Sequence, residues 1–239
     1  MESSPGLSRF SEVVGREDFT LDQAALLIGA WEYPGRDINE YRGELDAIAA
    51  RIAPEVARAQ NGTARAHAIS DHLFGHLGYA GNHDDYYDPR NTFLCEVIDR
   101  RMGIPISLSV LYLEVARRVG VLAQGVNFPG HFIVRVAIED AWLFLDPFSG
   151  GRELTPSDLE ALLRKTTTPS AVLEPSVIAA ASKRQIVARM LVNLAGIYGR
   201  NGDLPRSLDV LERLAVLEPS NPRIARDLTS LRERVDGLN

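Results

Sequence analysis

Three things are scarce in this chain: cysteine, long apolar runs and clustered positive charge. Cys95 is the single cysteine among 239 residues, so an internal disulfide is excluded and a reducing compartment is favoured. No stretch approaches the roughly 18 apolar residues that a membrane-spanning helix needs. Residues 1–10 lack the apolar centre of a signal peptide. We therefore expect a cytoplasmic protein without a membrane partner.

The charge balance argues against a nucleic-acid partner. The formal net charge is −6 and the pI is near 5.4. Arg100-Arg101 and Arg117-Arg118 are isolated pairs, typical of solvated helix faces and not of a basic binding surface. No glycine-rich phosphate loop is present, so no cofactor is predicted. His72 and His76 lie four residues apart but lack the glutamate of the metalloprotease pattern, so no metal site is predicted either.

The chain does contain a series of amphipathic helical segments in its first half. Thr20 and Gln23 form a capping-box pattern at the start of the first segment, and Asn91 is expected to cap the fourth. Residues 1–18 are expected to be a frayed lead, and Gly150-Gly151 are expected to close the sheet region. We expect helices over residues 21–31, 38–50 (running on toward 52), 64–77, 92–101 and 105–119.

A β-hairpin is predicted in the middle of the chain. β-Branched and aromatic residues fill 131–138 and 141–148, and Glu139-Asp140 separates the two arms. If this dipeptide is a two-residue turn, side-chain alternation puts His131 and Asp146 on one face of the hairpin. They are then diagonal neighbours at about 7–8 Å, within reach of an imidazole–carboxylate contact. A three-residue loop would place them on opposite faces.

A histidine held by an aspartate is two thirds of a nucleophilic triad. The carboxylate fixes the tautomer of the imidazole while the other ring nitrogen takes the proton of the nucleophile. The same two residues also suit a structural role, because His131 follows a Pro-Gly turn and Asp146 precedes a proline. Both interpretations stay open on the hairpin alone.

The last part of the chain has a different character, because from Lys183 onward the pattern is helical throughout. A helix pair with tetratricopeptide spacing is predicted from Leu191, Leu194, Ala195, Tyr198, Gly202, Ser207, Leu211 and Pro219. A plain helical hairpin is the alternative. Since a lone pair cannot bury its own apolar face, it must pack on the preceding domain or on a partner.

The predicted fold class is α+β. A helical N-terminal layer (residues 19–90) precedes a core helix and a small antiparallel sheet (91–165), and together they form a domain over 19–170. Residues 171–239 are expected to form an all-α, tetratricopeptide-like tail.

Four motifs resemble those of a known superfamily. They are Tyr86-Tyr87-Asp88-Pro89-Arg90-Asn91, Arg100-Arg101-Met102-Gly103-Ile104-Pro105-Ile106-Ser107-Leu108-Ser109, Pro129-Gly130-His131-Phe132 and Leu145-Asp146-Pro147-Phe148. Their order resembles the transglutaminase-like superfamily, in which a cysteine that opens a core helix is followed by His and Asp on adjacent strands. They look like the bacterial "regulator of sirC expression" family, which joins a transglutaminase-like domain to a tetratricopeptide tail. The resemblance implies a cleft around His131 and Asp146, lined by Asn91, Pro105, Tyr87 and Gly130.

The departure from that pattern lies in the nucleophile. Gly103-Ile104-Pro105 fits the Gly-x-Cys register of the superfamily, which puts Pro105 where the thiol should be. Ser107 is two residues further on, but its side chain points about 200° around the helix. Cys95 preserves the chain order of the triad near a helix start, where the macrodipole lowers a thiol pKa. Its apolar neighbours nevertheless favour an inert, buried thiol.

Two functions are expected from these residues. The first is a transglutaminase-like domain that lacks the usual thiol and acts as a regulatory or protein-binding module, with a protein partner on its helical tail. The second is an acyl-transfer or amide-hydrolysing enzyme, in which Cys95 or Ser107 attacks, His131 is the general base and Asp146 orients it. The oligomeric state is left open.

Overall fold

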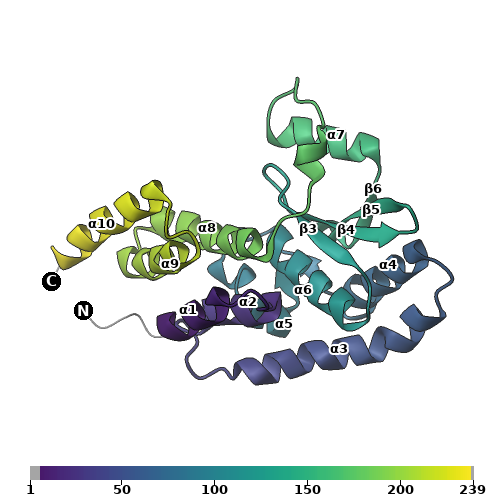
Figure 1. Ribbon diagram of the computed structural model, residues 1–239, viewed down its shortest axis with the longest axis horizontal. Helices are drawn as coiled ribbons and strands as arrows, with labels where there is room; N and C mark the ends of the chain where they lie inside the picture. Colours follow the sequence, from purple (N-terminus) through teal and green to yellow (C-terminus); the bar gives the residue numbers. More distant parts are fainter. Residues whose placement is uncertain (1–5, 238–239) are drawn as a thin grey trace.

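The computed structural model describes residues 6–237, and Figure 1 shows a mixed helical and β-sheet body with a helical tail. The α-helices are α1 (Leu7–Gly15), α2 (Leu21–Gly29), α3 (Ile38–Arg58), α4 (Gly62–Ser70), α5 (Leu94–Arg100), α6 (Pro105–Arg118), α7 (Pro156–Thr166), α8 (Lys183–Asn201), α9 (Leu204–Leu217) and α10 (Pro222–Asp236). The strands are β1 (Ala80–Gly81), β2 (Met102–Gly103), β3 (Ala123–Val126), β4 (Ile133–Ile138), β5 (Ala141–Asp146) and β6 (Arg152–Leu154). The shorter elements are the π-helical turn η1 (Asp71–His76) and the 3₁₀ turns η2 (Pro89–Asn91), η3 (Pro147–Ser149) and η4 (Pro175–Ile178). The predicted α+β class is confirmed.

The larger sheet has the strand order β3-β4-β5-β6, and each neighbouring pair is antiparallel. Alternate side chains of β4 serve two hydrophobic clusters. Val134 and Val136 join the main core around α6, whereas Ile133 packs in a smaller cluster with Leu159 and Leu163 of α7. Both faces of β4 therefore carry buried side chains, while Arg135, Ala137 and Ile138 are only partly buried.

The expectation that Gly150-Gly151 closes the sheet region was wrong, because the strand β6 follows them. Both glycines have positive φ (73° and 76°), which L-residues with a Cβ rarely adopt. They turn the chain back so that Arg152 pairs with Asp146 at the end of β5. The glycine pair is thus a hairpin turn within the sheet.

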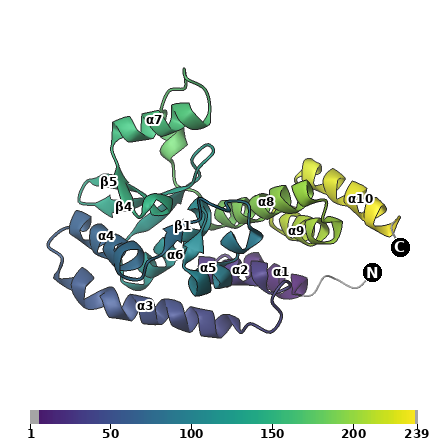
Figure 2. The same cartoon turned by 180° about the vertical axis from the view of Figure 1, so that it is seen from behind.

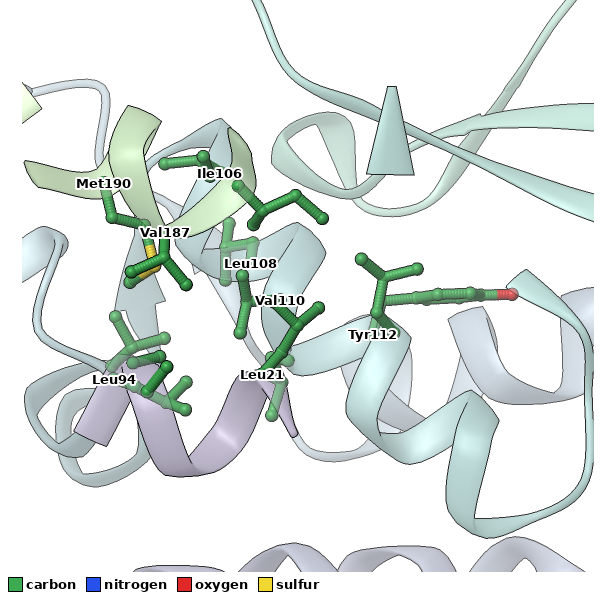
Figure 3. Close-up of a cluster of buried hydrophobic side chains, with 14 of the residues drawn as sticks. Leu21, Leu94, Ile106, Leu108, Val110, Tyr112, Val187 and Met190 are labelled. Atoms are coloured by element: carbon green, nitrogen blue, oxygen red, sulfur yellow. The ribbon is translucent and has the colours of Figure 1, made fainter. Parts of the chain in front are cut away.

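Helix α6 lies at the centre of the main core. Figure 3 shows Leu108 of α6 in one cluster with Leu94 of α5 and with Val187 and Met190 of α8. These side chains are at most 1% exposed. The first helix of the C-terminal segment therefore shares one hydrophobic core with the N-terminal helices.

The N-terminal segment is more ordered than its sequence indicated. Residues 7–15 form α1, whose Phe10 and Val14 are fully buried, and α1 packs against α2 and α9 (Figures 1 and 2). The expectation of a frayed lead was wrong for the described part, residues 6–18, and its first five residues lie outside the described chain.

Helix α3 also departs from the expectation, because it runs through Pro54 to Arg58. A proline inside a helix removes one backbone hydrogen bond. The buried residues Ile52 and Val56 lie on either side of Pro54 and anchor both turns to the core. Packing thus outweighs the lost hydrogen bond.

The Thr20–Gln23 capping box at the start of α2 is confirmed. In the described residues no helix is both long and apolar enough to cross a membrane.

Candidate active-site hollow

The β4–β5 hairpin brings His131 and Asp146 together as its register predicts. Ile138 pairs with Ala141 and Val134 with Leu145, so Glu139-Asp140 is the two-residue turn. The imidazole Nε2 of His131 lies 3.0 Å from the Oδ1 atom of Asp146. The predicted contact between the two side chains is confirmed, and it is direct.

Asp146 is held by three donors. Besides His131, the backbone N–H of Phe148 donates to its Oδ1 atom (3.1 Å) and the hydroxyl of Ser149 donates to its Oδ2 atom (2.8 Å). Burial alone would raise the pKa of this carboxyl. The hydrogen bond and charge of His131, followed by Ser149 and the Phe148 amide, outweigh burial and hold the Asp146 pKa below its ordinary value. Asp146 is therefore an ionised acceptor that fixes one nitrogen of the imidazole.

His131 lies in the wall of a shallow hollow with room for about one water molecule. Pro105 and Ile106 at the start of α6 form one side, and Gly130 and Phe132 flank the histidine in sequence. Gly130 has a φ of +65°, and a Cβ atom there would lie 2.8 Å from the Cβ atom of Thr166. Pro105 and Gly130 thus line the hollow, as expected from the resemblance.

The remaining wall comes from elements that the sequence did not connect with the site. Tyr86, Arg189 and Asn193 complete the lining. Arg189 and Asn193 belong to α8, and Arg189 donates a hydrogen bond to the side chain of Asn127 (2.9 Å). No local signal marks these two residues, because helical spacing cannot tell which distant loop a helix covers.

The start of α6 presents Pro105 to the hollow of His131, and Ser107 is not among the residues that line it. Pro105 is the first helical residue, which suits a proline because the N–H it lacks would have no helical acceptor there. Ser107 is fully buried, and its hydroxyl donates to the Asn91 carbonyl (2.5 Å) and accepts from the Ile104 N–H (3.1 Å). The Ser107 hydroxyl therefore helps to cap the N-terminus of α6.

Cys95 lies in a different part of the molecule. It faces a small hollow between α5 and α2, where it meets Gly29, Tyr33 and Arg36. This hollow shares no lining residue with the hollow of His131. Burial raises the pKa of the Cys95 thiol, and the nearby charge of Arg36 offsets only part of that rise. Cys95 is thus a buried thiol whose surroundings disfavour the thiolate.

Asn91 is fully buried and does not cap α5, which begins at Leu94 with Phe93 as its N-cap. That expectation was wrong because the Asn91 side chain forms its hydrogen bonds with the 82–86 loop and not with α5. Its Nδ2 atom donates to the Asp85 carbonyl (2.7 Å), and its Oδ1 atom accepts from the Asn82 amide (3.1 Å). Asn91 is therefore a positioning residue that fastens the 82–86 loop beside α6.

The 82–86 loop carries an aromatic cluster to the rim of the hollow. The Phe148 ring lies 4.4 Å from the His83 ring, 5.9 Å from Tyr86 and 6.2 Å from His131, measured between centroids. Tyr87 is 57% exposed, and the guanidinium of Arg200 on α8 lies 3.9 Å above its ring. Tyr87 thus bridges the loop to the C-terminal helices and stays outside the hollow proper.

The other histidines do not form a metal centre. The His72 and His76 rings are 6.1 Å apart on η1. Across residues 6–237 no group of three or more His, Cys, Asp or Glu side chains gathers in a way that could hold a metal ion.

A family model described as the transglutaminase-like superfamily matches residues 39–192. The chain therefore belongs to the transglutaminase-like superfamily.

Its similar relatives include proteins of bacteria and animals. The chain is 38% identical over 217 residues to a UPF0162 protein of Xylella fastidiosa strain 9a5c, covering 90% of this chain and 77% of that protein. It is 31% identical over 208 residues to a UPF0162 protein of Pseudomonas aeruginosa, covering 87% and 76%. Human F-box only protein 21 is 34% identical over 138 residues, or 54% of this chain and 21% of that protein.

One solved structure shares the fold. The crystal structure of menin, whose title reports the binding site for the Mixed Lineage Leukemia protein, superposes with a TM-score of 0.50 at 11% identity. The superposition covers 98% of this chain and 63% of menin. At this identity the likeness concerns the fold alone.

Proposed function

We propose that this protein is a transglutaminase-like module without covalent turnover, which acts by binding a protein partner. The observation that carries the proposal is the pairing of Pro105 with His131 in one hollow. Proline has neither a thiol nor a hydroxyl, so the base and its aspartate face a helix start that cannot attack a substrate. The Ser107 hydroxyl is hydrogen-bonded in the cap of α6, and the Cys95 thiol is buried in the core. The hollow then serves as a binding feature.

The partner contact is proposed for the C-terminal helices. Leu191, Leu194 and Tyr198 of α8 are buried and Gly202 ends the helix at a φ of +68°, which supports a tetratricopeptide-like pair. A groove of about 340 Å³ lies between α8, α9 and α10. The resemblance to regulators of sirC expression supports a regulatory role. A single buried cysteine suits the cytoplasm.

The absence of turnover is tested with nucleophile-directed probes on the full chain. We expect Cys95 to resist iodoacetamide at pH 7.5 until urea unfolds the protein, because its thiol is buried and its pKa is raised. A fluorophosphonate should leave Ser107 unlabelled. Rapid labelling of either residue in the folded protein, lost in His131→Ala, would contradict the proposal.

The partner contact is tested by substitution, because removing α8 would strip side chains from the main core. Arg234 lines the groove, whereas Arg226 is exposed on the same helix outside it. A protein that co-purifies with the full chain through the groove should be lost with Arg234→Glu and retained with the matched control Arg226→Glu. Equal retention by both variants would exclude the groove as the contact.

The second candidate is an acyl-transfer or amide-hydrolysing enzyme, and the intact His131–Asp146 contact favours it. In that case Ser107 would lose its proton to His131, and N–H groups in the first turn of α6 would stabilise the oxyanion. Cys95 lies in the separate hollow between α2 and α5, so its thiol would first have to reach His131. The probes above decide between the two candidates, because only an enzyme of this kind labels in a His131-dependent way.

A further inference from the structure

We propose that the uncovered end of the β3 edge, at Ala123, together with the hollow beside it, binds an acidic peptide segment of a protein partner by strand addition. This site lies away from the His131 hollow and from the groove between α8, α9 and α10. It therefore stands or falls independently of the function proposed above.

The first observation is that β3 is an edge strand with outward-pointing backbone groups. The N–H of Ala137 donates to the Leu122 carbonyl (2.9 Å), and β4 residues pair with β3 in a constant antiparallel register. Antiparallel pairs alternate between hydrogen-bonded and non-hydrogen-bonded positions. Gln124 and Val126 therefore bond to β4, and the backbone groups of Ala123 and Gly125 point away from it.

The second observation is that the chain itself occupies part of this edge. The N–H of Ala181 donates to the Gly125 carbonyl (2.8 Å), and Ala180 forms an antiparallel bridge with Val126. At Ser182 the backbone turns into α8 and leaves the edge. The protein thus displays an extended, small-residue segment on β3, and it stops before reaching Ala123.

The third observation is a hollow of about 300 Å³ that begins where this segment ends. Ala123 and Gly125 of β3 contribute to its lining, and Leu113, Val121 and Phe19 give it an apolar surface. A hollow of this size is at the lower end of those that hold ligands. In strand addition, main-chain hydrogen bonds provide affinity and such a hollow accepts alternate side chains.

The charged side chains at the rim of this hollow indicate the charge of the peptide that it binds. Lys183 and Arg117 contribute two positive charges, and Glu114 contributes one negative charge that is already paired with Arg117 (2.8 Å) and Arg118 (2.6 Å). Lys183 is exposed, and its ammonium donates a hydrogen bond to the Phe19 carbonyl and lies 4.9 Å from the centroid of the Phe19 ring. The excess of positive charge favours a peptide with carboxylates flanking its small apolar residues.

The experiment uses the full chain and the probe peptide acetyl-Glu-Ala-Val-Ala-Val-Glu-amide, titrated by NMR with amide exchange measured in parallel. We expect saturable binding and slower exchange of the Ala123 and Gly125 amides. A matched peptide that is N-methylated at alternate residues keeps the side chains but loses backbone donors, so it should bind at least about tenfold more weakly. The same peptide with Lys in place of Glu should also bind more weakly.

Two protein variants locate the site. Ala123→Pro removes an outward N–H without touching a bond to β4, a position where edge strands tolerate proline, and it should weaken binding about tenfold. Lys183→Glu should weaken binding about fivefold. The matched control Lys165→Glu, at an exposed position of α7, should leave binding unchanged. If Ala123→Pro fails to fold, the N-methylated peptide decides the matter on the unaltered protein.

Three outcomes would overturn the proposal. The probe shows no saturable binding at millimolar concentration, or the N-methylated peptide binds as well as its parent. Alternatively, the protein is a dimer without peptide and Ala123→Pro makes it monomeric, in which case the β3 edge joins two copies of this chain.

Discussion

Two hollows in this molecule hold, between them, the three residue types of a nucleophilic triad. The hollow at the start of α6 has an imidazole and an ionised carboxylate but presents a proline. The hollow between α2 and α5 has a thiol, and its lining contains Arg36 and two tyrosines but no histidine. The chain order Cys95, His131, Asp146 is that of a triad. Chain order thus says which residues are present, while packing decides whether they meet.

The difference also shows what each hollow requires of its surroundings. Three donors hold Asp146 in the charged form, and the aspartate fixes the imidazole. Cys95 is held among core side chains, and burial opposes its thiolate. The first hollow is organised around a carboxylate, whereas burial in the second disfavours a thiolate. A binding role that uses His131 is therefore compatible with an inert Cys95.

The largest expected effect comes from supplying the missing group with Pro105→Cys in a Cys95→Ala background. The new thiol would lie at a helix N-terminus beside His131, two features that lower a thiol pKa to about 3.5–7.5. We expect alkylation by iodoacetamide at pH 6.5 to be about tenfold faster than that of a free thiol. The rate is followed by mass spectrometry against pH.

The control for this variant is the same protein with His131→Ala. Losing the imidazole should move the onset of alkylation toward the pH of an ordinary thiol, whereas a local change in exposure alone would leave it in place. If Pro105→Cys reacts only above about pH 8, the hollow does not hold the base in a working position, and the contrast between the two hollows fails.

How much of this could be predicted from the sequence depends on the range of the interaction. The contact of His131 with Asp146 follows from a two-residue turn and side-chain alternation, both of which are local. The capping of α6 by Ser107 and the fastening of the 82–86 loop by Asn91 were missed, because each links segments whose approach is set by packing. Arg189 gave no signal for the same reason.

The N-terminal helix α1 illustrates the same limit. Leu7, Phe10 and Val14 follow a helical apolar spacing, but the pattern spans only about two turns, which is too short to distinguish a helix from an unstructured lead. Contact with α2 and α9 buries both side chains. Isolated helices of this length are marginal in water, so tertiary packing supplies the stability of α1.

An effect of intermediate size is expected from Asp146→Asn. The substitution removes a buried charged acceptor from three donors, and we expect it to lower the free energy of unfolding by about 2–3 kcal/mol at pH 7. The Asp146 pKa is lowered in the folded state, so its contribution is present above the unfolded pKa of about 4 and is lost as the pH falls through the folded value. Urea unfolding at pH 7, 5 and 3 measures this.

The matched control is Asp140→Asn, an exposed aspartate in the turn of the same hairpin, which should change the unfolding free energy by less than about 0.5 kcal/mol at each pH. The gap between Asp146→Asn and the parent protein should narrow toward pH 3. A gap that stays constant with pH would mean that the carboxylate is not the group around which the first hollow is organised.

The smallest expected effect concerns the outer rim of the first hollow, where Tyr87 meets Arg200. Tyr87→Ala removes a cation–π contact at an exposed site and should cost about 0.5–1 kcal/mol of stability. Tyr87→Phe keeps the ring and should cost almost nothing, because no hydrogen bond of the Tyr87 hydroxyl contributes to the contact. Amide exchange of the 82–86 loop, measured on both variants, separates a local loosening from a global loss of stability. Faster exchange in Tyr87→Ala alone would mean that the contact with Arg200 on α8 stabilises the 82–86 loop. Equal exchange in both variants would mean that the hydrogen bonds of Asn91 to this loop are sufficient to stabilise it.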